Sequence, residues 1–66
     1  MSDVHGEPLA DGDYVESLRY GLGKCRLLET EAGWVYESVE NGQRVSRLRM
    51  VDAATGFQKV RRLPAG

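Results

Sequence analysis

Hydrophobic and polar residues along the chain follow the alternation of short β-strands. Glycines divide the chain into five short runs rich in Val, Leu, Tyr and Trp, which are "DYVESLRY", "KCRLLETEA", "WVYESVE", "QRVSRLRMV" and "FQKVRRL". These residue types suit a pleated, half-buried surface. None of the runs has apolar residues at the i, i+3, i+4 and i+7 positions of an amphipathic helix. Turn signals at intervals of about 8–12 residues predict an all-β domain, a small five-stranded antiparallel barrel.

The 66 residues form one domain with three predicted parts. Residues 1–10 contain glycine, proline and acidic side chains without periodicity, so we expect a flexible acidic N-terminal arm. The barrel is expected over residues 11–63, and a frayed C-terminus over 64–66. A core of this size supplies only about 3–5 kcal/mol, which makes self-association a further source of stability.

The strongest local signal is Asn41-Gly42, which lies between two strand-like runs. Both residues tolerate positive φ, so the pair predicts a two-residue type I′ hairpin turn. In the register that this turn sets, Tyr36 faces Arg47. Residues that face each other share one side of a sheet, so the register also predicts which side chains lie together.

The hairpin then has two distinct faces. The predicted core face carries Val35, Val39, Leu48 and Met50. The opposite face carries Trp34, Tyr36, Ser38, Val45, Arg47 and Arg49. We expect this second face to meet solvent or a partner, because burying two unpaired arginines costs more than exposing one tryptophan. The competing interpretation places Trp34 in the core, since large aromatic residues dominate small cores.

The stretch "SLRYGLGKC" at residues 17–25 has three interpretations. A phosphate-binding loop needs four residues between its glycines and a following helix, and neither is present. A catalytic thiol at Cys25 needs a base within reach, but the only histidine, His5, lies in the predicted arm. We therefore predict a tight corner at Gly21 and Gly23, with Cys25 as a small buried hydrophobic residue.

The composition excludes several kinds of site. One cysteine and one histidine allow neither an internal disulfide nor a four-ligand zinc site of the Cys/His kind. The chain has no apolar run near the length of a membrane span, and its first residues lack the apolar centre of a signal peptide. A single cysteine without an export signal fits the reducing cytoplasm. We expect a cytoplasmic protein without metal or cofactor.

Charge is distributed unevenly along the chain, although the net charge is only -1. Residues 1–42 carry nine acidic and three basic side chains, a balance of -6, whereas residues 43–66 carry one acidic and six basic side chains, a balance of +5. The six bases are Arg44, Arg47, Arg49, Lys59, Arg61 and Arg62. This asymmetry predicts either a basic face or strands from the two halves that neutralise each other.

The segment "GDYVESLRYGLGKCRLLE" (12–29) resembles the opening of SH3-like or Tudor-like barrels in bacterial proteins that bind RNA polymerase. These include CarD-type regulators, the transcription-repair coupling factor and the C-terminal Tudor-like domain of repair helicases. The matching positions are Gly12, Asp13, Val15, Tyr20, Gly21 and Gly23. The resemblance covers about a third of the chain. It implies a small barrel with a protein partner, for which RNA polymerase is the candidate.

These observations predict a non-enzymatic protein-interaction module. Its predicted partner-binding residues are Trp34, Tyr36, Arg47, Arg49, Arg44, Lys59, Arg61 and Arg62. Two alternatives remain, a nucleic-acid-binding barrel and a self-associating subunit that forms a homodimer or a higher oligomer. The sequence pI of about 5.7 favours a protein partner over nucleic acid.

An enzyme is not expected, and no catalytic residue is assigned. Type II dihydrofolate reductases are also short SH3-like barrels with a Gly-Asp-x-Val opening. This chain lacks their Val-Gln-Ile-Tyr stretch, and its sequence shows no acid–base pair placed for chemistry.

Overall fold

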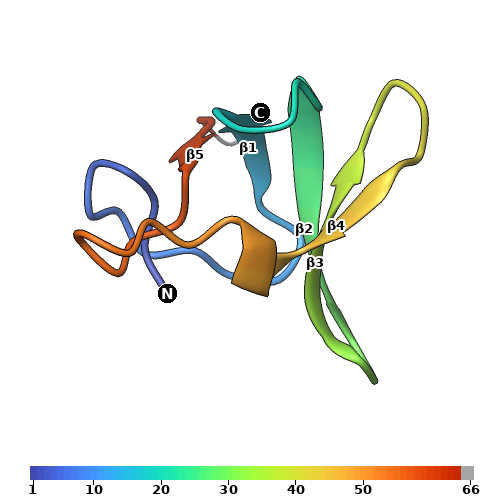
Figure 1. The fold of residues 1–66 in the computed structure, drawn as a ribbon. Helices are drawn as coiled ribbons and strands as arrows, with labels where there is room; N and C mark the ends of the chain where they lie inside the picture. The colour runs from blue at the N-terminus through green and yellow to red at the C-terminus, as the bar shows by residue number, and fades with distance from the viewer. Residues whose placement is uncertain (65–66) are drawn as a thin grey trace.

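A computed structural model describes residues 1–64 and shows one antiparallel sheet (Figure 1). Its elements are β1 (Tyr14–Ser17), β2 (Lys24–Thr30), β3 (Gly33–Ser38), β4 (Arg44–Ser46), the 3₁₀ helix η1 (Arg47–Arg49) and β5 (Val60–Arg62). The strand order is β4-β3-β2-β1-β5. The prediction of an all-β domain with five antiparallel strands is confirmed. The sheet is not closed into a barrel, because β4 and β5 are its two edges and do not pair with each other.

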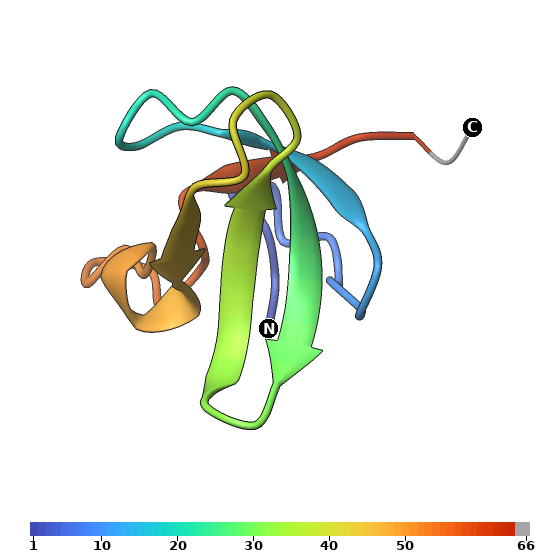
Figure 2. The same ribbon diagram turned by 90° about the vertical axis from the view of Figure 1, so that its right-hand side faces the viewer.

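The long strands β2 and β3 form the middle of the sheet and lie side by side (Figure 2). The N-terminal segment and the connection from η1 to β5 lie on the same side of β2, β3 and β4 (Figure 1). The hydrophobic core fills the space that these segments cover. Its buried members are Val15, Leu22, Cys25, Leu27, Tyr36, Val45, Met50 and Val60.

The core face of the hairpin is the opposite of the predicted one. Tyr36 is fully buried and pairs with Val45, which is also buried, whereas Val39 and Leu48 are 54% and 68% exposed. Large aromatic side chains dominate small cores, so the competing interpretation of this face was the correct one. Met50 is the one member of the predicted core face that is buried, and it lies beyond η1 rather than in β4.

The reason for this inversion lies at the end of β4. The opposite face was predicted because burying Arg47 and Arg49 would be costly. Neither arginine is in the strand, because β4 ends at Ser46 and the chain turns into η1. The Ser46 hydroxyl accepts a hydrogen bond from the Leu48 N–H at 3.2 Å, which caps this short helix. Burying Tyr36 therefore does not bury the arginines.

The turn between β3 and β4 is wider than the predicted two-residue turn. Five residues, 39–43, separate the strands, and Tyr36 pairs with Val45 instead of Arg47. Gly42 has a φ of 74°, but Asn41 does not share the positive φ that a type I′ turn requires. The Asn41 side chain instead accepts a hydrogen bond from the Gln43 N–H at 2.8 Å. This local Asx bond competes with the tighter turn, so the type I′ prediction was wrong.

The N-terminal segment, where a flexible or loosely docked arm was expected over residues 1–10, is hydrogen-bonded to the rest of the domain. The Gln58 N–H donates to the Ser2 carbonyl at 2.8 Å, and the Val4 N–H donates to the Val60 carbonyl at 2.9 Å. Periodicity gave no sign of this docking, because the segment is held by single hydrogen bonds rather than by a strand. The predicted frayed end at 64–66 lies outside the described residues except for Pro64.

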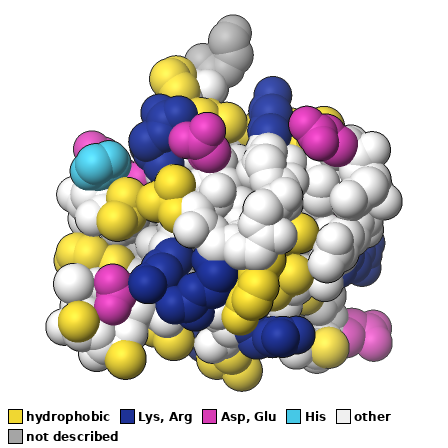
Figure 3. Space-filling model, turned by 45° about the horizontal axis from the view of Figure 1, so that its top comes forward, with side chains coloured by type: hydrophobic (Ala, Val, Ile, Leu, Met, Phe, Trp, Pro, Cys, Tyr) yellow, Lys and Arg dark blue, Asp and Glu magenta, His cyan; other side chains and the backbone are white. Residues whose placement is uncertain are grey.

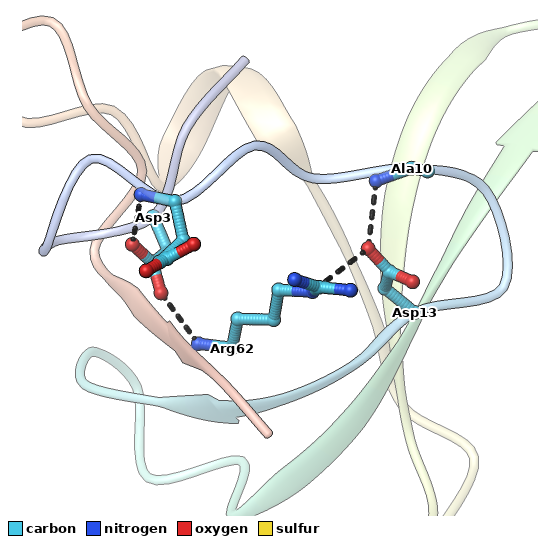
Figure 4. A network of polar contacts seen from close by, with 5 residues as sticks. Asp3, Ala10, Asp13 and Arg62 are labelled. Carbon is cyan, nitrogen blue, oxygen red and sulfur yellow. Dashed lines mark hydrogen bonds and ion pairs between the residues drawn. The ribbon is translucent and has the colours of Figure 1, made fainter. Parts of the chain in front are cut away.

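Asp3 is the centre of this docking (Figure 4). Its side chain is almost fully buried, and its carboxylate accepts hydrogen bonds from the N–H groups of His5 and Glu7, each at 2.9 Å, and of Arg62 at 2.8 Å. Burial acts to raise the pKa of Asp3, but these backbone donors outweigh it and hold the pKa below the ordinary value of 3.8. The charged carboxylate therefore joins the N-terminal loop to β5.

A second carboxylate extends the same network (Figure 4). Asp13 accepts a hydrogen bond from the Ala10 N–H at 2.8 Å and lies 3.5 Å from the guanidinium of Arg62. Arg62 is thus held by its backbone at Asp3 and by its side chain at Asp13. The residues before β1 and the end of β5 are linked through these two acids.

Next to the docked N-terminal segment, a buried side-chain pair connects β3 to the residues before β5. The Tyr36 hydroxyl donates a hydrogen bond to Gln58 Oε1 at 2.9 Å, and both side chains are buried. Burial raises the pKa of Tyr36, against a smaller opposing effect of the Arg47 charge. The hydroxyl is therefore a permanent donor at neutral pH.

We expect Asp3→Asn to lower the free energy of unfolding at pH 7 by about 1–3 kcal/mol, because it removes a charged acceptor of three backbone donors. A folded-state pKa below the unfolded one stabilises the protein above the unfolded pKa, and this stabilisation is lost as pH falls through the folded pKa. The difference in the free energy of unfolding between wild type and Asp3→Asn should therefore be largest at pH 7 and become smaller below about pH 4. Urea unfolding at a series of pH values measures both.

The matched control is Asp11→Asn, which alters an exposed carboxylate that accepts a single backbone N–H, from Glu29. Asp11→Asn should lower the free energy of unfolding at pH 7 by less than Asp3→Asn does. An equal loss in the two variants, or a difference for Asp3→Asn that does not change with pH, would contradict the role given to Asp3.

We expect Tyr36→Phe to lower the free energy of unfolding by about 1–3 kcal/mol, because it leaves the buried oxygen of Gln58 without its donor. Tyr14→Phe, at an exposed tyrosine of β1, serves as the control and should change stability by less than about 0.5 kcal/mol. Thermal and urea unfolding of both variants measure the difference. Equal stability of the two variants would show that the buried hydrogen bond contributes nothing.

Candidate functional site

The aromatic members of the predicted partner-binding set lie at the core. Tyr36 is fully buried, so its assignment to an exposed partner surface was wrong. Trp34 is half-buried and packs against the core cluster. The physical reason is the face inversion described above, which turns the aromatic side of β3 toward the core.

Three of the six predicted basic residues are already paired with carboxylates of this chain. The pairs are Arg44 with Glu37 at 2.7 Å, Arg61 with Glu16 at 3.0 Å and Arg62 with Asp13 at 3.5 Å. Exposed pairs of this kind contribute about 0–1 kcal/mol. These arginines neutralise acids from the first half of the chain, which is one of the two outcomes that the charge asymmetry predicts.

The other three bases, Arg47, Arg49 and Lys59, lie where the loop after β1 meets η1 and the start of β5. The Lys59 N–H donates to the Met50 carbonyl at 2.6 Å, and the Lys59 carbonyl accepts from the Leu18 N–H at 3.0 Å. Lys59 therefore joins the residue after η1 to the residue after β1. Three separate stretches of the chain converge at this point.

Tyr20 completes the junction. Arg19 donates from Nη1 to the Arg49 carbonyl at 2.7 Å, and the Tyr20 hydroxyl donates to the same carbonyl at 3.3 Å. The guanidinium carbons of Arg49 and Arg19 lie over the Tyr20 ring, 5.3 and 5.9 Å from its centroid. Contacts of this kind at exposed sites contribute about 0.5–1 kcal/mol each. Tyr20 is nevertheless 49% exposed.

The backbone of Tyr20 is in a conformation that tyrosine rarely adopts. Its φ is 66°, the only positive φ of a non-glycine residue within residues 1–64, and Gly21 and Gly23 follow with φ of 62° and 68°. The predicted two-glycine corner is therefore confirmed, and it begins one residue earlier than the glycines. Left-handed backbone costs about 1–2 kcal/mol at a residue with a Cβ, so the corner holds an exposed tyrosine under strain.

We call this region the Tyr20 surface. Side-chain contacts join Arg19, Tyr20 and Arg49. The surface also includes their neighbours in the same three backbone segments, which are Leu18, Arg47, Leu48 and Lys59. Leu18 and Leu48 are both more than half exposed. The space-filling view shows lysine and arginine side chains directly beside hydrophobic ones on the face in view (Figure 3).

Four members of the Tyr20 surface were missing from the predicted set, namely Leu18, Arg19, Tyr20 and Leu48. One signal was present in the sequence, an arginine and a tyrosine directly before Gly21. The contact that brings the β1–β2 loop to η1 joins Arg19 to Arg49, which are 30 residues apart. No local pattern of residues predicts a contact over that distance.

A second exposed tyrosine, Tyr14, offers a natural comparison. It lies in β1 on the outer face of the sheet, with Lys24 Nζ 4.8 Å and the Arg26 guanidinium carbon 5.9 Å from its ring centroid. Its backbone is an ordinary extended strand. Glu16, two residues further along β1, and Glu37, which pairs with Arg26 across the sheet, are both ion-paired. Only Tyr20 combines flanking cations with a strained backbone among the described residues.

The remaining candidates for chemistry are not built as sites. Cys25 is fully buried, as predicted, and burial raises the pKa of its thiol. Within residues 1–64, no group of three His, Cys, Asp or Glu side chains is placed to hold a metal ion. A shallow hollow beside the N-terminus is lined by Asp3, His5, Glu7, Arg61, Arg62, Leu63 and Pro64. Its aspartate and arginines are already engaged with one another or with Glu16 and Asp13.

No helix in the described part of the chain is long and apolar enough to cross a membrane. No family model, curated protein or solved structure matches the chain. Tyrosine and arginine are enriched at the centre of protein interfaces, and both occur on the Tyr20 surface beside exposed leucines.

We expect a thiol reagent to label Cys25 in the native protein at least about tenfold more slowly than in urea, because a buried thiol with a raised pKa stays neutral and shielded. A double variant, Cys25→Ser with Ala53→Cys, places the only thiol at an exposed turn and should react at nearly the same rate with and without urea. Equal labelling of native and denatured wild type would contradict the core role of Cys25.

Proposed function

We propose that the chain is a non-enzymatic protein-interaction module that binds its partner through the Tyr20 surface. The observation that carries this proposal is an exposed tyrosine, held in left-handed backbone between two arginines that have no carboxylate partner in residues 1–64. Strained residues cluster at functional sites, where the strain is part of the design. Tyrosine and arginine are also the residue types most enriched at binding hot spots.

A protein partner fits the charge better than nucleic acid does. The sequence pI is about 5.7, whereas a dedicated nucleic-acid-binding domain usually exceeds about 9. The outer face of the sheet mixes acids and bases, as the pairs Arg44–Glu37 and Arg61–Glu16 show. Four bases without a carboxylate partner in residues 1–64 belong to the Tyr20 surface, beside two exposed leucines that a phosphate backbone would not use. The other two, Lys24 and Arg26, flank Tyr14.

The resemblance of residues 12–29 to RNA-polymerase-binding barrels supports a bacterial RNA polymerase as the first partner to test. Three of the matching residues, Tyr20, Gly21 and Gly23, belong to the corner that forms the Tyr20 surface. Self-association through the same surface is the second possibility to test, because small domains often gain stability in this way.

The variant Tyr20→Gly separates binding from folding. Glycine adopts the φ of 66° without strain, which returns about 1–2 kcal/mol, while the lost cation–π contacts cost about 0.5–1 kcal/mol each. Stability should therefore stay within about 1 kcal/mol of wild type in urea unfolding. Association with RNA polymerase, measured by surface plasmon resonance, should weaken at least about tenfold. Sedimentation velocity measures self-association of the same variant.

The control is Tyr14→Ala, which removes the other tyrosine that lies between two cations. It should leave association within about twofold of wild type, the scale of an energetically neutral contact. The proposal fails if Tyr20→Gly keeps every association of wild type, or if Tyr14→Ala loses as much. Binding to single-stranded and duplex DNA and RNA is measured in parallel, and nucleic-acid binding that is tighter than any protein association would favour the alternative.

A further inference from the structure

The basic residues of this chain fall into two groups by their partners. Arg44, Arg61 and Arg62 each have a carboxylate within 4 Å, whereas the bases of the Tyr20 surface have none within residues 1–64. The unpaired members of this surface are Arg19, Arg47, Arg49 and Lys59. Lys24 and Arg26, beside Tyr14, also have no ion pair in the described chain. The Tyr20 surface therefore has the larger group of unpaired bases.

The guanidinium groups of Arg19 and Arg49 are held in place, but they keep N–H donors that could bind a partner. Arg19 uses one of its five N–H donors in the hydrogen bond to the Arg49 carbonyl, at 2.7 Å. The side chain of Arg49 lies over the Tyr20 ring and makes no ion pair in the described chain. Contact with Tyr20 and with the η1 backbone restricts both side chains before binding, which lowers the entropy that a partner must overcome.

The hydrophobic part of the surface flanks these cations in sequence. Leu18 precedes Arg19, and Leu48 lies between Arg47 and Arg49 in η1. Both leucines are more than half exposed. A ligand for this surface must therefore present apolar side chains and negative charge within a short stretch.

We infer that the Tyr20 surface binds a short acidic segment of a partner protein, in which Asp or Glu residues flank a large hydrophobic residue. Carboxylates match the forked geometry of arginine and can accept two hydrogen bonds from one guanidinium. The hydrophobic residue would cover Leu18 and Leu48, which nothing covers in the described chain. This inference rests on the proposed function and adds the chemistry of the partner.

Nucleic acid fits this geometry less well. Single-stranded bases bind by stacking on exposed aromatic rings. Over the Tyr20 ring, the guanidinium carbons of Arg49 and Arg19 already lie at 5.3 and 5.9 Å, where a base would stack. A phosphate backbone would satisfy the arginines but leave both leucines in water. A carboxylate-bearing peptide satisfies both parts of the surface.

The probe is a fluorescein-labelled peptide, Gly-Ser-Asp-Glu-Leu-Asp-Glu-Leu-Asp-Gly-Ser, titrated with the full chain and followed by fluorescence anisotropy. Two peptides of the same length serve as controls, one with Asn and Gln in place of every acid and one with Ser in place of each Leu. Both should bind at least about tenfold more weakly than the probe, because each lacks one of the two recognised features. Raising the NaCl concentration from about 50 to about 200 mM should weaken binding of the probe several-fold.

Arg49→Glu reverses one charge of the surface and should weaken the probe at least about tenfold. Arg49→Gln removes the charge with a smaller change and should give an intermediate loss. Arg26→Glu makes the same reversal beside Tyr14 on the outer face, and should change binding less than about threefold if recognition is local. Circular dichroism and urea unfolding confirm that each variant is folded.

The outcomes separate this inference from the proposed function. If Tyr20→Gly weakens a protein association but the neutral peptide binds as well as the acidic one, the acidic segment is wrong and the interaction surface stands. Equal losses for Arg49→Glu and Arg26→Glu would show only a response to net charge and overturn the inference. Tighter binding of a single-stranded oligonucleotide than of the acidic probe would also overturn it. The inference would also be overturned if the wild-type chain formed a dimer that Arg49→Glu dissociates, while the acidic probe failed to bind.

Discussion

The end of β4 at Ser46 is the constraint on which both the core and the surface depend. The chain turns into η1 there, with the Ser46 hydroxyl capping the Leu48 N–H at 3.2 Å. Val45 can then stay in the core beside Tyr36, while Arg47 and Arg49 leave the sheet. A longer β4 would place these arginines on the same side as Tyr36, where their burial without partners would be costly.

Polar contacts between distant parts of the chain complete this small core. Asp3 holds the N-terminal loop against β5 through three backbone N–H groups, and Tyr36 holds β3 against the segment before β5 through Gln58. No buried side-chain nitrogen or oxygen in the described residues lacks a hydrogen-bond partner. Because a domain this short buries only about 60% of its unfolded surface, such satisfied polar contacts add order that apolar packing alone would not supply.

The Tyr20 surface is a consequence of the same turn. Since η1 directs Arg49 away from the sheet, its carbonyl can accept hydrogen bonds from Arg19 and from the Tyr20 hydroxyl. These contacts offset part of the cost of a tyrosine at a φ of 66°. The outer face of the sheet carries two carboxylate–arginine pairs beside the unpaired Lys24 and Arg26. The surface that combines four unpaired bases with a strained tyrosine is the one we assign to a partner.

Local sequence patterns determined the all-β class, the strand-forming runs, the glycine corner and the burial of Cys25, because alternation and glycine φ preferences act over a few residues. The hairpin register placed Arg47 and Arg49 in the predicted binding set, and the basic second half of the chain added Lys59; their role in binding stays a prediction. The choice of core face, the hairpin register, the docking of Asp3 and the role of Tyr20 were decided by tertiary structure. Each depends on where β4 ends or on contacts across tens of residues, such as Arg19 with Arg49 and Asp3 with Arg62. Periodicity reports which side chains share a face, but only packing of the whole chain selects the face that is buried.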